Sequence, residues 1–394
     1  MGTFKALSLG ALPPVRRAVP LRRGSAAGRL LMDRFFGNRR ITLYTSGTAA
    51  LAHAITRCVE RKPVTAPEVI IPAYGCPDLV AACIYASVFP RLVDVSPDQW
   101  SYDAKSLTAS LSPNTIAIVA VNLLGLGDSS AALAKICKDK GISLIQDSAQ
   151  HLPRDEIEWP GDYVVLSFGR GKPLNLLHGG ALVAPPGDMS APAVIPKHYT
   201  QRDRFLSSRL AGIAFNLLTR PLPYRLLSSL PRTGLGAVEY RPLTNADVLP
   251  EEAWTQVASA FAHYLDSPSY RRDLWNDAIN AWSHLGIVAL GAADSRLPRE
   301  PLRLALLAPD RQARDQIVAD LTKAGLGASR LYGTGLPELR AMPNAIVSQG
   351  SLPNANFLGE RLFTLPTHKM VRTHTVRSAV TIVALHNRRP VRSK

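Results

Sequence analysis

Short apolar runs alternate with amphipathic stretches between Thr45 and Val183. The runs, rich in β-branched residues, predict buried strands at Glu68–Pro72, Arg91–Val95, Thr115–Val121, Ile142–Gln146 and Tyr163–Phe168. The stretches between them repeat apolar residues at helical spacing and predict helices at Pro77–Ser87, Ala104–Leu111 and Ser129–Lys140. This alternation predicts an α/β fold in which helices cover both faces of a mostly parallel central sheet.

The C-terminal third has a different pattern, which predicts a smaller α+β domain. Its expected elements are helices at Glu251–His263, Tyr270–His284 and Asp310–Ala324, a strand near Arg303–Leu307, and a last element around Thr375–Leu385. We therefore expect a basic N-terminal extension at 1–40, a large domain at 41–250 and a small domain at 251–394.

The chain is strongly basic, with 46 Lys and Arg against 30 Asp and Glu and a formal net charge of +16. This excess predicts an anionic partner: a phosphorylated cofactor, a nucleotide-linked substrate, nucleic acid or a membrane surface. Nucleic acid is the weakest of these, because the basic residues are not interleaved with stacking aromatic residues.

Two segments concentrate the positive charge. Residues 1–32 contain no acid and lack the apolar core of a secretory signal, so they are either a targeting or membrane-contacting arm or an extension packed on the domain. The segment 195–245 mixes arginines with apolar clusters, and its uncharged run Leu210–Thr219 is shorter than the ~20 residues of a membrane span. An amphipathic helix on a membrane surface and a helix packed on the body or at a subunit contact explain this segment equally well.

The four cysteines form no C-x-x-C pair and have no histidine at zinc spacing. They indicate reduced thiols in a cytoplasmic compartment and no structural metal.

Candidate chemistry follows the carboxyl ends of the predicted strands, where ligands collect in open α/β sheets. Small residues at Tyr44–Leu51 begin a helix and suit either a phosphate or an ordinary N-cap. Asp147 ends a strand as a cap or as a partner for a ligand cation, such as a protonated pyridine ring. Lys172 follows another strand, and Pro173 keeps it out of a helix, so its amine is a candidate for a Schiff base.

The phosphate-binding P-loop is the obvious alternative for the glycines and the lysine around Lys172. It fails because Leu166 occupies the first glycine position and Pro173 follows the lysine. A dinucleotide-binding G-x-G-x-x-G motif is also absent.

The order and spacing of seven short motifs resemble those of a known family. The motifs are Ser46–Leu51, Ile71–Tyr74, Val93–Val95, Asp147–Gln150, Ser167–Lys172, Gly179–Gly180 and Leu365–His368. Together they resemble the DegT/DnrJ/StrS family of aminotransferases, which have PLP fold type I, depend on pyridoxal 5'-phosphate (PLP) and often act on nucleotide-linked keto sugars.

The resemblance implies a role for each matching residue. Lys172 would form the internal aldimine with PLP, Asp147 would pair with the pyridine nitrogen, and Gln150 would lie near the ring hydroxyl. The phosphate would be held by Gly47, Thr48 and Ser167. The family also implies a homodimer and an amino donor, glutamate, besides the keto-sugar acceptor.

Two positions depart from the family pattern. Cys76 stands where an aromatic residue usually stacks on the ring, and Tyr74 is a possible substitute. His178 replaces a carboxylate, so it either contacts substrate or is a structural histidine. We expect an aminotransferase, with another PLP-dependent reaction or a non-catalytic regulatory or membrane-surface protein of the same fold as alternatives.

Overall fold

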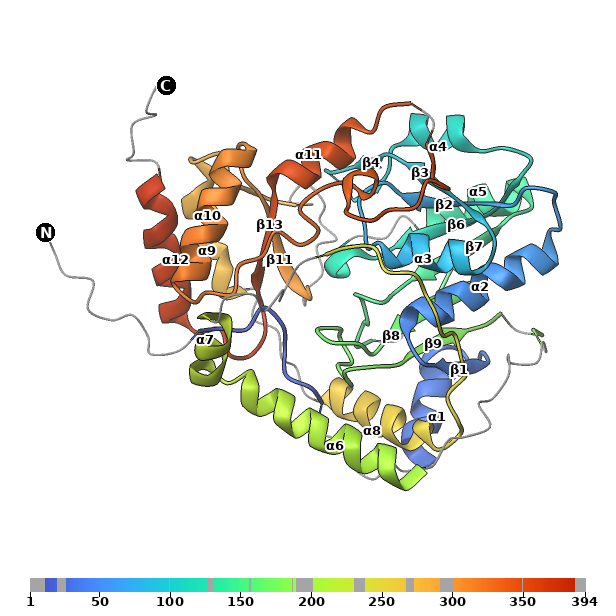
Figure 1. The fold of residues 1–394 in the computed structure, drawn as a ribbon, viewed down its shortest axis with the longest axis horizontal. Helices are drawn as coiled ribbons and strands as arrows, with labels where there is room; N and C mark the ends of the chain where they lie inside the picture. The colour runs from blue at the N-terminus through green and yellow to red at the C-terminus, as the bar shows by residue number, and fades with distance from the viewer. Residues whose placement is uncertain are drawn as a thin grey trace, which may run out of the picture.

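The computed structural model describes residues 11–19, 26–98, 100–126, 130–155, 157–185, 187–188, 201–229, 238–266, 273–290, 301–348 and 350–386. Its centre is an eight-stranded sheet with the strand order β1-β9-β8-β7-β6-β2-β3-β12 (Figure 1). The strands are β1 Ile41–Tyr44, β9 Gly180–Val183, β8 Tyr163–Ser167, β7 Ser143–Asp147, β6 Thr115–Val121, β2 Glu68–Pro72, β3 Phe89–Val93 and β12 Val347–Ser348. All neighbouring pairs from β8 to β12 are parallel, whereas β9 runs antiparallel to both β8 and β1. The predicted mostly parallel α/β fold is confirmed.

Helices cover both faces of this sheet, which is why its strands are apolar throughout rather than alternating. One face packs against α2 (Gly47–Arg61) and α3 (Asp78–Tyr85). The other packs against α4 (Ala104–Ser110) and α5 (Ser130–Lys140) under the central strands and against α1 (Ala26–Phe35) and α8 (Ala253–Asp266) under β1, β8 and β9. Short elements complete this part of the chain: β4 Val95–Ser96, β5 Ser101–Tyr102 and η1 Leu123–Gly125.

The small domain has a three-stranded antiparallel sheet with the order β10-β11-β13. Its core contains the buried rings of Trp275 and Trp282. Its elements are η2 Asp273–Trp275, α9 Asn276–Ser283, β10 Val288–Ala289, β11 Arg303–Leu307, α10 Arg311–Lys323, η3 Leu336–Glu338, α11 Pro353–Arg361, β13 Leu362–Pro366 and α12 Thr373–His386.

Helix α8 packs with α1 and with β1, β8 and β9 of the large sheet. Strand β12, from the C-terminal part of the chain, pairs in parallel with β3 of the large sheet. At the same edge, Asp94 accepts hydrogen bonds from the Asn354 and Ala355 backbone N–H groups at the start of α11 (3.0 and 2.8 Å).

The basic segment that follows β9 contains two helices, α6 (Gln201–Leu218) and α7 (Pro221–Ser229). In Figure 1 they form the lower edge of the molecule, below α8 on one side and the small domain on the other. Among the residues that the structure describes, no helix combines the length and the apolar character needed to cross a bilayer.

Residues 11–19 of the N-terminal extension form an extended strap between the two domains, and we call them the N-terminal strap. The Ala11 and Leu12 backbone N–H groups donate to the Pro221 and Gly325 carbonyls (2.8 and 2.7 Å). Buried Arg303 of the small domain donates to the strap carbonyl of Pro14. Of the two interpretations of the extension, the strap fits packing on the protein body; residues 1–10 and 20–25 lie outside the described part.

Candidate active site

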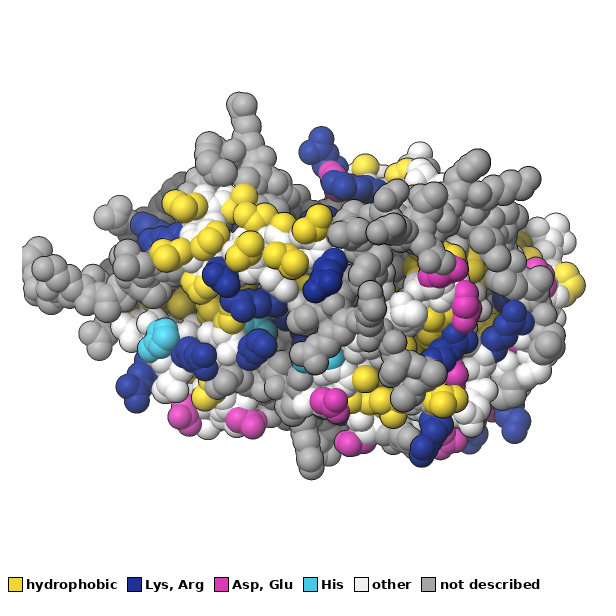
Figure 2. Space-filling view, turned by 90° about the horizontal axis from the view of Figure 1, so that it is seen from below, with side chains coloured by type: hydrophobic (Ala, Val, Ile, Leu, Met, Phe, Trp, Pro, Cys, Tyr) yellow, Lys and Arg dark blue, Asp and Glu magenta, His cyan; other side chains and the backbone are white. Residues whose placement is uncertain are grey.

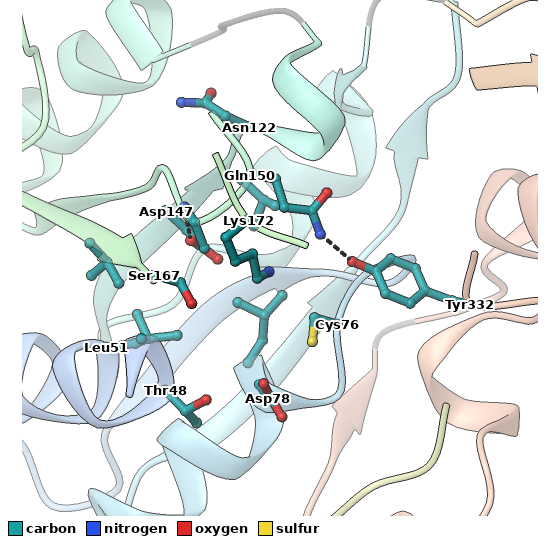
Figure 3. Close-up of a pocket in the computed structure, with 15 residues that line it drawn as sticks. Thr48, Leu51, Cys76, Asp78, Asn122, Asp147, Gln150, Ser167, Lys172 and Tyr332 are labelled. Atoms are coloured by element: carbon teal, nitrogen blue, oxygen red, sulfur yellow. Dashed lines mark hydrogen bonds between the residues drawn. The ribbon is translucent and has the colours of Figure 1, made fainter. Parts of the chain in front are cut away.

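A pocket with an empty volume of about 510 Å³ opens at the carboxyl ends of β6, β7 and β8 (Figure 3). The three strands bring Asn122, Asp147 and Ser167 to one edge of the sheet, as the parallel arrangement requires. The full lining is Gly47, Thr48, Leu51, Cys76, Asp78, Leu79, Val121, Asn122, Asp147, Ala149, Gln150, Val165, Ser167, Lys172 and Tyr332. The pocket therefore unites most of the predicted site residues.

The N-terminus of α2 forms one end of the pocket. Ser46 caps the helix by accepting a hydrogen bond from the Ala49 N–H (3.0 Å), and this cap leaves the pocket side of the helix start available to a ligand. A side chain at Gly47 would place its Cβ 2.7 Å from Ser167 Cβ, so only glycine lets the helix start lie this close to β8. Thr48 and Ser167 both line the pocket here, and the positive end of the helix dipole favours an anion beside them.

Asp147 supplies the carboxylate of the site. Its Oδ1 accepts a hydrogen bond from the Ala149 N–H (2.9 Å), which fixes the side chain at the end of β7. Burial raises the pKa of Asp147, and the hydrogen bond from Ala149 and the charge of Lys172 only partly oppose this shift. A carboxylate held in this environment is stabilised by a cation placed against it.

Lys172 enters the pocket from the loop after β8. This loop turns at Gly171, whose φ of +78° suits glycine, and the Lys172 N–H donates to the Gly169 carbonyl (3.2 Å). Figure 3 shows the amine pointing into the pocket, near Asp147 and Gln150. The loop thus places the primary amine of Lys172 at the edge of the sheet where the Asp147 carboxylate lies.

Gln150 is held by two hydrogen bonds. Its Oε1 accepts from the Leu124 N–H and its Nε2 donates to the Tyr332 hydroxyl, both at 2.9 Å. Tyr332 comes from the C-terminal part of the chain and closes the pocket on the side opposite β7 (Figure 3).

Sequence reasoning missed Tyr332, Asn122 and Asp78 as pocket residues. Asn122 directly follows β6, so the rule about strand ends could have found it. Tyr332 lies in no motif and is 182 positions from its partner Gln150, so nothing in the local sequence marks it.

The two candidates for ring stacking lie in different places. Cys76 lines the pocket, and burial raises the pKa of its thiol to about 12, which keeps the sulfur neutral. Tyr74 is fully buried outside the pocket lining, where its ring packs edge-on against Tyr332 (5.4 Å between centroids) and Trp100 (6.4 Å). This packing does not favour Tyr74 as the substitute stacking residue, because Tyr332 lines the pocket and Tyr74 does not.

His178, the remaining candidate, is exposed and does not line the pocket. It precedes Gly179, which has a φ of +91°, at the turn into β9.

The N-terminal strap holds the loop that carries Lys172. Arg16 donates from Nη1 to the Pro173 carbonyl (2.8 Å), and Asn175 Nδ2 donates back to the Arg16 carbonyl (2.9 Å). The Val19 N–H donates to the Asn175 carbonyl (2.8 Å), and a Cβ at Gly171 would lie 2.8 Å from Val15 Cγ1. The position of the lysine loop therefore depends on a segment that begins more than 150 residues earlier.

Comparison with known proteins agrees with this geometry. A model of the DegT/DnrJ/EryC1/StrS aminotransferase family matches residues 31–218. The 3-amino-5-hydroxybenzoate synthase of Amycolatopsis mediterranei is 34% identical over 152 residues, which cover 36% of this chain and 37% of the relative. Protein MosB of Rhizobium meliloti is 27% identical over 119 residues, covering 30% of this chain and 23% of the relative. The matches thus span at most about two fifths of either curated relative.

Solved structures share the fold over nearly the whole chain. A DegT DnrJ EryC1 StrS aminotransferase from Brucella abortus aligns with a TM-score of 0.63 and 18% identity, over 92% of this chain and 89% of that one. The GDP-4-keto-6-deoxy-D-mannose-3-dehydratase of E coli, solved with bound hydrated PLP, aligns with a TM-score of 0.64 and 14% identity, over 94% and 99%. The predicted resemblance and fold type are confirmed.

Proposed function

We propose that this protein is a PLP-dependent aminotransferase that binds its cofactor through Lys172. The observation that carries the proposal is the convergence in one pocket of an amine, a half-buried carboxylate and a helix N-terminus. The family match of residues 31–218 supports the same activity.

The residues present fit PLP at both of its ends. Thr48 and Ser167, beside the N-terminus of α2, would hold the phosphate, with Gly47 allowing their close approach. Asp147 would keep a proton on the pyridine nitrogen, because a cation there relieves the unfavourable burial of its carboxylate. The neutral Cys76 thiol would contact the ring where relatives usually place an aromatic side chain.

The bound cofactor supplies an electron sink for the carbon that carries the exchanged amino group. Lys172 would hold the cofactor covalently and then move a proton to and from that carbon as general base and acid. Gln150 would orient the ring hydroxyl while Tyr332 fixes the amide. Hydrogen bonds between the N-terminal strap and the lysine loop would keep Lys172 within reach of the cofactor and of that carbon.

We propose as acceptor a keto sugar, nucleotide-linked or otherwise activated, with glutamate as amino donor. The name of the E coli structural neighbour, which contains a keto-deoxy sugar nucleotide, supports this class of acceptor. We also propose a homodimer, on the family resemblance of the large domain.

Covalent labelling tests the assignment of Lys172. Borohydride reduction of the protein saturated with PLP should fix the cofactor on Lys172, as located by mass spectrometry of peptides. Lys172→Ala should abolish the label at this site, and a label on a different lysine in the wild type would refute the proposal. With glutamate as donor, Asp147→Asn should retain PLP but lower the rate of the half-reaction at least 100-fold, because the pyridine nitrogen loses its carboxylate.

A further inference from the structure

Helices α6 and α7 present an apolar face to solvent. Six of the thirteen large exposed hydrophobic residues among those described lie on these two helices. They are Leu210, Ile213, Leu217, Leu218, Leu222 and Leu226, with Leu226 71% exposed. Figure 2 shows apolar side chains gathered in one area on the lower face of the molecule, where α6 and α7 lie. A contiguous patch of this kind on a folded protein marks a contact surface.

Packing on the protein body explains only the inner face of these helices. Asn216 of α6 exchanges two hydrogen bonds with the Ala18 backbone of the N-terminal strap (2.8 and 3.1 Å), and Thr219 is buried. The Pro221 carbonyl at the start of α7 accepts a hydrogen bond from Ala11. The inner face is therefore already in contact with the protein, and the leucines on the outer face stay exposed.

The charge beside this patch has a single sign. From Arg204 to Val238 the sequence contains five arginines and no aspartate or glutamate. Arg209 and Arg220 are exposed next to the apolar residues, and Figure 2 shows basic side chains bordering the patch. Leucines with neighbouring cationic side chains are the composition of helices that lie in the interface of an anionic membrane.

A second copy of the chain fits this surface less well. In a twofold-symmetric contact the patch would face itself. The arginines of one copy would then approach those of the other, with no acidic side chain in the segment to neutralise them. A lipid surface with phosphate headgroups supplies both the negative charge and the apolar layer.

We propose that the outer face of α6 and α7 docks this protein on anionic phospholipid membranes. The leucines enter the boundary between headgroups and acyl chains, and Arg209 and Arg220 lie at the level of the lipid phosphates. The two helices then lie parallel to the membrane surface, and neither spans the bilayer. This inference is independent of the activity proposed for the pocket.

Co-sedimentation of the full-length protein with vesicles tests the proposal. Vesicles of phosphatidylcholine mixed with phosphatidylglycerol should bind the protein, salt should weaken that binding, and vesicles of phosphatidylcholine alone should bind at least 10-fold less. Leu222→Asp with Leu226→Asp should lower binding at least 10-fold, because each leucine loses its apolar contact with the lipid. Leu385→Asp, which changes an exposed leucine on α12, should bind as the wild type does.

A milder pair of variants and the oligomeric state complete the test. Arg209→Gln and Arg220→Gln keep the apolar face and should each weaken binding to the mixed vesicles about 5-fold. A wild type that sediments with neither kind of vesicle would overturn the proposal. So would leucine variants that bind vesicles normally but dissociate a dimer in sedimentation velocity, since the face would then be a contact between copies.

Discussion

Two asparagines hold the N-terminal strap at different places and allow its effect on the active site to be isolated. Asn175 is fully buried in the lysine loop, where it donates to the Arg16 carbonyl (2.9 Å) and accepts from the Leu177 N–H (3.2 Å). Leu177 adopts a φ of +75°, a conformation that a leucine keeps only when its surroundings enforce it. Asn216, on α6, makes both of its two hydrogen bonds to the Ala18 backbone of the strap.

We expect Asn175→Ala to destabilise the fold and to weaken cofactor binding. Its two partners would each lose a part-buried hydrogen bond, at about 1–2 kcal/mol each, so the free energy of unfolding should fall by about 2–4 kcal/mol. Lys172 lies three residues earlier in the same loop, so its amine should be held less well and the Kd for PLP should rise about 10-fold or more. Urea denaturation and a titration of visible absorbance with PLP measure the two effects.

Asn216→Ala is the matched control. It removes two hydrogen bonds, both to the strap, yet the lysine loop keeps its own contacts with Arg16 and Val19. We expect a loss of about 1–2 kcal/mol in the free energy of unfolding, with the Kd for PLP within twofold of the wild type. An equal rise of the Kd in both variants, or no rise in Asn175→Ala, would refute a direct role of the strap in positioning the lysine.

Two further predictions concern the helix start and the pH dependence of stability. Gly47→Ala should weaken PLP binding at least 10-fold, because its Cβ would lie 2.7 Å from Ser167 Cβ. The control Gly212→Ala, whose Cβ would have no atom within 4 Å, should bind PLP as the wild type does. Equal PLP affinity in the two variants would contradict this steric argument. Burial lowers the pKa of His368 to about 4 from 6.5, so the folded state binds fewer protons than the unfolded state between these pH values. The contribution of His368, about 3 kcal/mol, should be complete above pH 6.5 and disappear as the pH falls to 4. His368→Gln keeps a donor for the Pro13 carbonyl. In this variant the free energy of unfolding, measured by urea denaturation, should depend less on pH between pH 4 and 6.5. An unchanged pH dependence would exclude His368 as its source.

The sequence alone located five of the eight strands of the large sheet and the centre of the pocket. Strands β2 and β6 have the predicted limits, because a strand covered on both faces is apolar along its whole length. Asp147, Ser167 and Lys172 could be located because each follows a recognisable strand, and the carboxyl ends of neighbouring parallel strands meet at one edge of the sheet. Gly47 and Thr48 were identified through the family resemblance of the Ser46–Leu51 motif, and the structure places them at the start of α2.

Tertiary structure decided the features that depend on contacts between distant parts of the chain. Tyr332 reaches the pocket only because the two domains pack together, and the strap reaches the lysine loop across more than 150 residues. The direction of the Tyr74 ring and the packing of α8 against α1 depend on partners that no local sequence pattern identifies. Likewise, the leucines of α6 and α7 suited a buried or an exposed face equally well in the sequence. Which side of a helix meets solvent depends on what the rest of the fold places against it, and here the N-terminal strap occupies the inner side.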